Sequence, residues 1–260
     1  MTKAKFLIFS LWLVFLFPIL ILIIYTVAGR WSFPHLLPES FSLRSFQFVG
    51  DNFSNITYHL MGSLIYSLLT VILTILFSIL PASILAKQEF FGKSIVESLL
   101  MSPALLPVMT FSVGVHLIFI YLGLADNIFG VALVLAIYSY PYMMRSLIAG
   151  FRTIGGDYVN CARNLGATNF TILWKIEFPL LIPAIIAGGS IVFLISFSNY
   201  FLVFLIGGGA VPSFSGYLFP FLNSSDWSIA AILTLLFVLI PVLLFLLIDL
   251  TINRIYKRWI

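Results

Sequence analysis

Residues 157–179 read DYVNCARNLGATNFTILWKIEFP, a moderately polar stretch within a chain that is otherwise strongly apolar. Asp157 is suited to cap the start of a short helix, because its side chain can accept a bond from an unpaired backbone amide. Gly166 is suited to end that helix, because glycine tolerates the left-handed conformation that follows helix C-termini. Thr168 or Asn169 can cap a second helix. The stretch therefore predicts a helix, a glycine turn and a second helix.

Composition places the rest of the chain in a lipid bilayer. Hydrophobic residues make up 62% of the 260 residues and charged residues only 8%, whereas soluble domains carry about a quarter charged residues. The single cysteine, Cys161, excludes an internal disulfide. The three histidines are far apart in sequence, so no metal site is expected. Basic residues flank apolar segments and do not form one patch, so nucleic acid is not an expected partner.

The apolar segments are long enough for six membrane crossings, because a helix needs roughly 20 apolar residues to span a bilayer. We expect an all-α polytopic membrane protein with a single transmembrane domain over residues 1–260. Its six helices are predicted at about 6–28, 60–85, 95–122, 128–149, 183–206 and 228–250. Pro103 and Pro107 are expected to kink the third helix, and Pro179 and Pro183 to mark the entry to the fifth. Residues 212–225 are short for a crossing and lie at the interface or dip partway into the membrane.

The basic residues are unevenly distributed over the connections between these helices. Eleven of the thirteen lysines and arginines lie at the two ends of the chain, in the second connection, or in and just before the fourth connection at about 150–182. Only Arg30 and Arg44 lie on the other side. Cytoplasmic loops carry an excess of basic residues, so we expect both termini and the 150–182 loop in the cytoplasm.

This loop resembles the EAA motif of binding-protein-dependent ABC importer permeases, which reads Glu-Ala-Ala, three residues, Gly, nine residues, Ile, one residue, Leu-Pro. The positions that fit the motif or its usual surroundings are Ala162, Arg163, Leu165, Gly166, Ala167, Ile176 and Pro179. Three positions depart from it: Asn160 replaces Glu, Cys161 replaces the first Ala, and Phe178 replaces Leu. The resemblance covers roughly residues 60–250.

The resemblance implies the type I importer permease fold in a bacterial inner membrane. Two permease subunits would pair above two ATP-binding subunits, and an extracytoplasmic binding protein would deliver the substrate. The helix from Asp157 to the Gly166 turn would be the coupling helix that sits in a groove of the ATPase. The sequence has no phosphate-binding loop, so this chain is expected to be no enzyme and to bind no cofactor; the partner ATPase would bind ATP and Mg. Because Asn160 replaces the family glutamate, we expect the second permease to be a different chain, and docking at this residue to depend on shape.

Polar residues inside the predicted helices are candidates for the translocation path. Ser196 and Asn199 are three residues apart, which places them on one helix face, and Tyr200 follows. The alternative is that they hydrogen-bond to neighbouring helices. His116 in the third helix is a further path candidate, with a packed histidine as the alternative.

The chain looks most similar to spermidine/putrescine-type permeases, which implies a polyamine-like small solute. No carboxylate lies near residues 196–200, so ferric iron, thiamine, phosphonate and sulfate stay open as substrates. Two other classes of function are a stand-alone channel or secondary carrier and an intramembrane enzyme. A carrier would predict an internal inverted repeat, and an enzyme would predict clustered Asp, Ser or His deep in the helices; neither pattern is evident.

Overall fold

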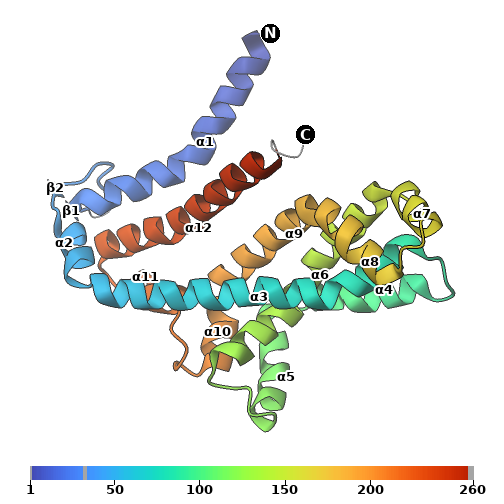
Figure 1. Cartoon of the computed structure of the whole chain (residues 1–260). Helices are drawn as coiled ribbons and strands as arrows, with labels where there is room; N and C mark the ends of the chain where they lie inside the picture. Colours follow the sequence, from blue (N-terminus) through green and yellow to red (C-terminus); the bar gives the residue numbers. More distant parts are fainter. Residues whose placement is uncertain (1, 32–33, 257–260) are drawn as a thin grey trace. The chain divides into compact units, whose positions relative to one another are not determined.

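The computed structural model describes residues 2–31 and 34–256, and nearly all of its regular structure is helical (Figure 1). It divides into two compact units: Met1–Leu60 together with Phe214–Ile260, and Met61–Ser213. The single permease domain stays a prediction, and each unit is described by itself.

The first unit contains helices from both ends of the chain. Its complete elements are α1 (Thr2–Val27), β1 (Ala28–Arg30), β2 (Ser40–Phe41), α2 (Arg44–Asp51), α11 (Phe214–Leu222) and α12 (Trp227–Tyr256). Helices α1 and α12 lie side by side (Figure 1). The antiparallel strands β1 and β2 pair Ala28 with Phe41, a small addition to the expected all-α fold. Phe214, Leu218 and Leu233 are core residues of this unit, so part of the 212–225 segment is a helix packed into protein.

The second unit contains the loop singled out by the sequence. Its elements are most of α3 (Phe53–Lys87), α4 (Lys93–Met101), the 3₁₀ helix η1 (Ser102–Leu105), α5 (Val108–Tyr121), α6 (Ile128–Ile154), α7 (Asp157–Asn164), α8 (Asn169–Ile172), the π-helix η2 (Leu173–Glu177), α9 (Phe178–Ser198) and α10 (Tyr200–Gly207). Helix α3 contributes its first residues to the other unit.

Helices α6 and α9 pack closely because small residues line their interface. A Cβ atom added to Gly150 would lie 2.6 Å from Cβ of Ala184, and one added to Gly188 would lie 2.9 Å from Cβ of Ser146. The Ser146 hydroxyl also donates to the Ala184 carbonyl at 2.7 Å. Small residues let helix backbones approach closely where lipid removes the hydrophobic drive to associate. The two helices that flank α7 are therefore tightly joined.

Four helical segments in the described part of the chain are long and apolar enough to cross a membrane. They are Phe53–Lys87, Ile128–Ile154, Asn169–Ser198 and Trp227–Ile248. Segments Lys93–Leu105 and Val108–Tyr121 qualify together as a fifth, although they meet at a bend of 101°. In α1, Leu13–Val27 is a shorter apolar helix, and the side chains of the predicted 6–28 span before Leu13 lie outside the described residues.

The bend confirms the expected kink at Pro103 and Pro107 and shows that residues 95–122 are not one straight helix. Pro103 lies in η1 and Pro107 caps the start of α5. Leu106 is extended, with φ −84° and ψ 135°, because the ring of a following proline disfavours helical backbone at the residue before it. A proline also lacks the amide that would continue the helical ladder.

The predicted fifth helix, 183–206, was wrong in its start and in being continuous. Helical structure runs from Asn169 to Ser198 without a break at Pro179 or Pro183. It then stops at Asn199, whose backbone is extended at φ −81° and ψ 94°, and resumes as α10. The first discrepancy has a local cause in η2, which is described with the site below.

Candidate coupling site around Gly166

Helix α7 begins one residue earlier than the predicted cap at Asp157 required. Gly156 occupies the N-cap position, and Asp157 is the first helical residue. A carboxylate in the first turn still interacts favourably with the positive end of the helix dipole. The backbone amide of Asn160 donates to the Gly156 carbonyl at 2.8 Å, which closes the first turn.

Gly166 ends α7 as the sequence predicted. Its φ is +83°, in the left-handed region. The Gly166 amide donates to the Arg163 carbonyl at 2.9 Å, and the Ala167 amide donates to the Ala162 carbonyl at 3.0 Å. This pair of bonds is the Schellman motif, which satisfies carbonyls left unpaired at a helix end. The chain therefore turns back directly after Gly166.

The second helix begins at the predicted threonine. The Thr168 hydroxyl accepts from the Thr171 amide at 3.3 Å and caps α8. Val159, Ala162 and Ile172 then form a small buried cluster, with Ala167 and Ile176 packed against it. Three of the motif positions are therefore the core of the helix–turn–helix, which gives their spacing a structural reason.

The remaining residues of α7 face outward. Asp157, Asn160, Cys161 and Arg163 are all exposed, and Cys161 is a free thiol. Large apolar side chains are also exposed along α7, the turn after it, α8 and η2: Tyr158, Leu165, Phe170 and Trp174.

Pro179 lies two residues after the end of a segment of π-helix. A proline inside an α-helix removes one hydrogen bond and its ring collides with the carbonyl four residues earlier, here that of Lys175. Residues Leu173–Glu177 widen into π-helix before Pro179, which relieves that collision and lets α9 continue. Sequence reasoning treated Pro179 as a boundary because it did not anticipate this widening.

A buried ion pair lies at the end of the π-helix, and sequence reasoning missed it. Glu177 is 2% exposed, and its Oε1 lies 2.5 Å from Nζ of Lys87 at the end of α3. The same Nζ lies 4.6 Å from the ring centre of Phe151 on α6. The pair therefore joins the ends of three long helices. The available signal was that Glu177 is the only acidic residue between Asp157 and Asp226.

A surface pocket of about 480 Å³ adjoins α7. Its lining includes the polar side chains of Lys87, Arg152, Asn160 and Arg163. The Arg163 guanidinium also lies 3.4 Å from Oδ1 of Asn169. The surface next to Asn160 is therefore basic, where the family pattern would place an acid.

The predicted path residues have different surroundings. Ser196 is buried and its hydroxyl donates to the Val192 carbonyl of its own helix at 2.6 Å. Asn199 lies in the break, where its side chain accepts from the Leu202 amide at 3.0 Å, so the shared helix face with Ser196 was wrong. Tyr200 stacks on Phe204 with ring centres 5.5 Å apart.

His116 is half-buried on α5, a helix that packs against α10. Helix α10 carries Tyr200. A role in translocation for any of these residues stays a prediction. The sequence led us to expect no metal site. The described residues contain no group of three or more His, Cys, Asp or Glu that could hold a metal ion.

The helix–turn–helix around Gly166 and the closely packed α6–α9 pair together define a class of membrane protein, the transmembrane subunits of ABC importers. The fold matches a chain in the crystal structure of a bacterial ABC transporter involved in the import of the acidic polysaccharide alginate. The TM-score is 0.71 at 17% identity, and the match covers 95% of this chain and 94% of the other. The chain belongs to the family of binding-protein-dependent transport system inner membrane components, whose model matches residues 74–259.

Curated relatives in this family carry different substrates in their names. The molybdate/tungstate transport system permease protein WtpB of Pyrococcus abyssi is 27% identical over 130 residues, 50% of this chain and 52% of the relative. The spermidine/putrescine transport system permease protein PotC of Haemophilus influenzae is 26% identical over 129 residues, 50% of each chain. The chain thus spans about half the length of the curated relatives it matches.

Proposed function

We propose that this chain is a permease subunit of an ATP-driven importer and that α7 transmits the action of a separate ATPase to the membrane helices. The observation that carries the proposal is the helix–turn–helix around Gly166, held between α6 and α9. Three positions of its small core, Ala162, Ala167 and Ile176, also fit the family motif or its usual surroundings. A short helix locked by a glycine turn can move as one body with the helices it joins.

Three contacts of the second unit support this mechanical role. The close α6–α9 packing at Gly150 and Gly188 leaves little room for the two helices to slide independently. The Lys87–Glu177 ion pair adds the end of α3 to the same group. A push on α7 would therefore move three helix ends together.

The exposed surface of α7 and α8 supports docking by shape more than by an ion pair at position 160. Tyr158, Leu165 and Phe170 expose 63%, 83% and 72% of their surface. Asn160 is neutral and lies beside Arg152 and Arg163 in the same pocket. We propose two ATP-binding subunits as the partners of this surface, and a second, different permease chain that keeps the family glutamate.

The remaining features of the assembly follow from family membership and charge distribution. We propose six membrane crossings, with α1 and the bent α4–α5 segment as two of them, and both termini in the cytoplasm of a bacterium. Among the basic residues that set this orientation, the side chains of Lys3, Arg254, Lys257 and Arg258 lie outside the described part of the structure. An extracytoplasmic binding protein delivers the substrate in this proposal, and ATP and Mg are bound by the ATPase.

For the substrate we propose a small solute of the kinds that the names of the relatives give. The resemblance to spermidine/putrescine-type permeases predicts a polyamine-like solute. One observation favours an anion as the second candidate: residues 178–225 contain no Asp or Glu. A polycation would lack a counter-charge along α9 and α10. Uptake assays with spermidine and with sulfate or molybdate would separate the two.

Two glycines provide a matched test of coupling. Gly166 and Gly92 both have positive φ, +83° and +81°, and a Cβ at either position would meet nothing within 4 Å. Alanine at either site costs about 1–2 kcal/mol in backbone strain. In proteoliposomes with the ATPase and binding protein, Gly166→Ala should lower substrate-stimulated ATP hydrolysis much more than Gly92→Ala. Equal effects of the two variants would contradict the coupling role of the turn.

A further inference from the structure

Two adjoining cavities lie in the first unit, and two aromatic residues line both of them. One has a volume of about 470 Å³ and the other about 480 Å³. Tyr25 at the end of α1 and Trp227 at the start of α12 belong to both linings. The two cavities are therefore parts of one continuous depression along α1 and α12.

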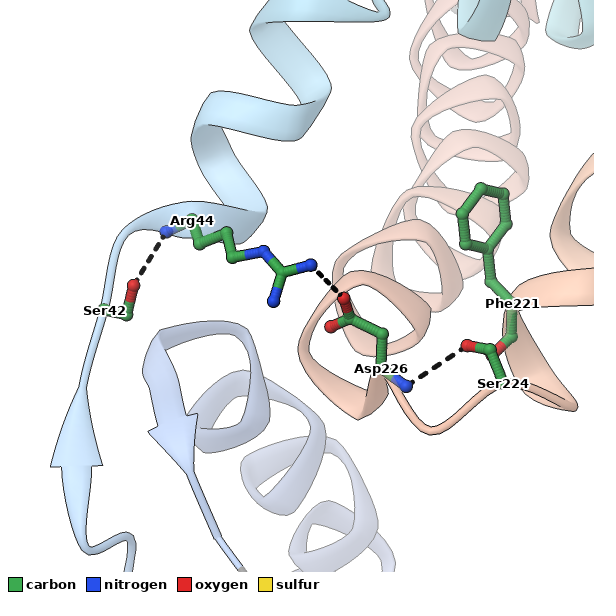
Figure 2. A network of polar contacts seen from close by, with 5 residues as sticks. All are labelled: Ser42, Arg44, Phe221, Ser224 and Asp226. Carbon is green, nitrogen blue, oxygen red and sulfur yellow. Dashed lines mark hydrogen bonds and ion pairs between the residues drawn. The ribbon is translucent and has the colours of Figure 1, made fainter.

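The first cavity is polar and basic. It contains Arg30 and Arg44, the only two basic residues that the charge pattern leaves on the predicted extracytoplasmic side. Figure 2 shows the Arg44 guanidinium bound to Oδ2 of Asp226 at 2.6 Å, with the Asp226 amide donating to Ser224 at 3.2 Å. Within the described residues, the side chain of Arg30 has no ion pair. The two arginines and one aspartate therefore leave one net positive charge.

The second cavity is apolar and lies between the two long helices. Besides the shared aromatics, its lining is Pro18, Ile21, Leu22, Leu222, Ala230, Ala231 and Thr234. The hydroxyl of Thr234 donates to the Ala230 carbonyl of its own helix at 2.7 Å. This groove therefore offers apolar surface and small side chains, with its one hydroxyl already bonded.

The aromatic pair marks the level at which the polar and apolar parts meet. Tyr25 stacks on Trp31 with ring centres 4.4 Å apart, and Trp227 is 57% exposed. Tyr and Trp are enriched at the membrane–water interface, where their rings meet acyl chains and their polar edges meet headgroups. The polar cavity is thus placed for a headgroup and the groove for a hydrocarbon chain.

We propose that this depression binds one phospholipid, with its phosphate beside Arg30 and Arg44 and an acyl chain in the groove between α1 and α12. A phosphodiester carries one negative charge, which matches the net charge of the polar cavity. A free phosphate would leave the groove empty, and a purely apolar helix from a second protein would leave Arg30 without a partner. The bound lipid stabilises the packing of α1 on α12.

Lipid retention by the purified full chain in detergent tests the proposal, with dioleoylphosphatidylglycerol as the probe and native mass spectrometry as the readout. A basic residue near an anionic lipid contributes about 1 kcal/mol, or roughly fivefold in affinity. Arg30→Gln should lose roughly fivefold, and Arg30→Gln with Arg44→Gln roughly 20-fold. The control pair Arg145→Gln and Arg152→Gln removes the same charge at the predicted cytoplasmic side and should change affinity less than about twofold.

Two further experiments distinguish the phosphate of a lipid from free inorganic phosphate. Leu22→Trp, which fills the groove, should also weaken lipid binding, whereas inorganic phosphate in large excess should not displace the lipid. Circular dichroism and the melting temperature check that each variant is folded. The proposal is overturned if Arg30→Gln retains lipid as the wild type does, if Leu22→Trp has no effect, or if inorganic phosphate competes. It is equally overturned if a photoreactive group at Leu22 crosslinks in native membranes to a protein chain and to no lipid.

Discussion

Removing the positive partner of the buried Lys87–Glu177 pair should destabilise the unit strongly. In Lys87→Met the methionine keeps most of the apolar stem near Phe151 but leaves the Glu177 carboxylate buried and without its cation. Lys87 is the only partner found for Oε1 of Glu177 among the described residues. The variant therefore isolates the cost of an uncompensated buried charge.

The size of the effect follows from the geometry. Two unit charges 2.5 Å apart attract by roughly 7 kcal/mol at an effective dielectric constant of 20, before desolvation is subtracted. Breaking one partner of such a buried pair costs about 3–5 kcal/mol. For a chain of this size, that corresponds to a melting temperature lower by roughly 10 °C.

The opposite single variant should be milder. In Glu177→Gln, the side chain of Lys87 is left without an acid, but it is 35% exposed and can turn its ammonium group toward water. We expect a loss of about 1–2 kcal/mol. The double variant Lys87→Met with Glu177→Leu should return close to the wild-type melting temperature, because apolar pairs often replace buried ion pairs without loss.

Melting temperatures of the four proteins in the same detergent provide the test. The expected order is wild type and double variant highest, Glu177→Gln next and Lys87→Met lowest. If the two single variants are equally mild, or if the double variant is as unstable as Lys87→Met, the buried-pair reasoning is refuted.

Three further predictions concern stability in the same melting assay. Gly150→Ala should lower the free energy of unfolding by about 1–3 kcal/mol, because its Cβ would meet α9 at 2.6 Å. Gly114→Ala should be neutral or stabilising by up to about 1 kcal/mol, because nothing lies within 4 Å of its Cβ. Equal effects of the two variants would contradict the close α6–α9 packing. Thr168→Ala should cost about 1 kcal/mol of unfolding free energy through its lost cap. Thr153→Ala, an exposed control in the last turn of α6, should cost less than about 0.5 kcal/mol. Arg44→Gln should cost under about 1 kcal/mol, because its side chain is 68% exposed and water screens the ion pair; a larger loss would show that this pair is structurally essential.

The parts of the site that the sequence predicted depend on local chemistry. The left-handed φ of Gly166 and the cap by Thr168 involve residues close together in the chain, and their preferences act whatever surrounds them. The spacing from Gly166 to Ile176 was also informative, because both positions serve the small core of the helix–turn–helix. The cap assigned to Asp157 failed by one residue, which is the usual uncertainty of helix ends.

The parts that the sequence did not predict depend on distant contacts or on backbone adjustment. Lys87 and Glu177 are 90 residues apart, and only the packing of α3 near the end of η2 brings them together. Pro179 was read as a boundary, yet the π-helix before it lets the helix continue. Asn199 interrupts an apolar run that contains no proline or glycine between Ser190 and Ile206, so no strong breaker marked that position.

The central claim is that α7 lies on the cytoplasmic face and contacts a separate ATPase. Cys161 tests it directly, because it is the one cysteine of the chain and is exposed on α7. In membranes that contain the whole importer, a maleimide carrying a photoreactive group is attached to Cys161 and activated by light. We predict that Cys161 reacts with impermeant maleimide only from the cytoplasmic side, and that its crosslink is to the ATP-binding subunit. Labelling from the outside, or crosslinks to lipid alone, would contradict it.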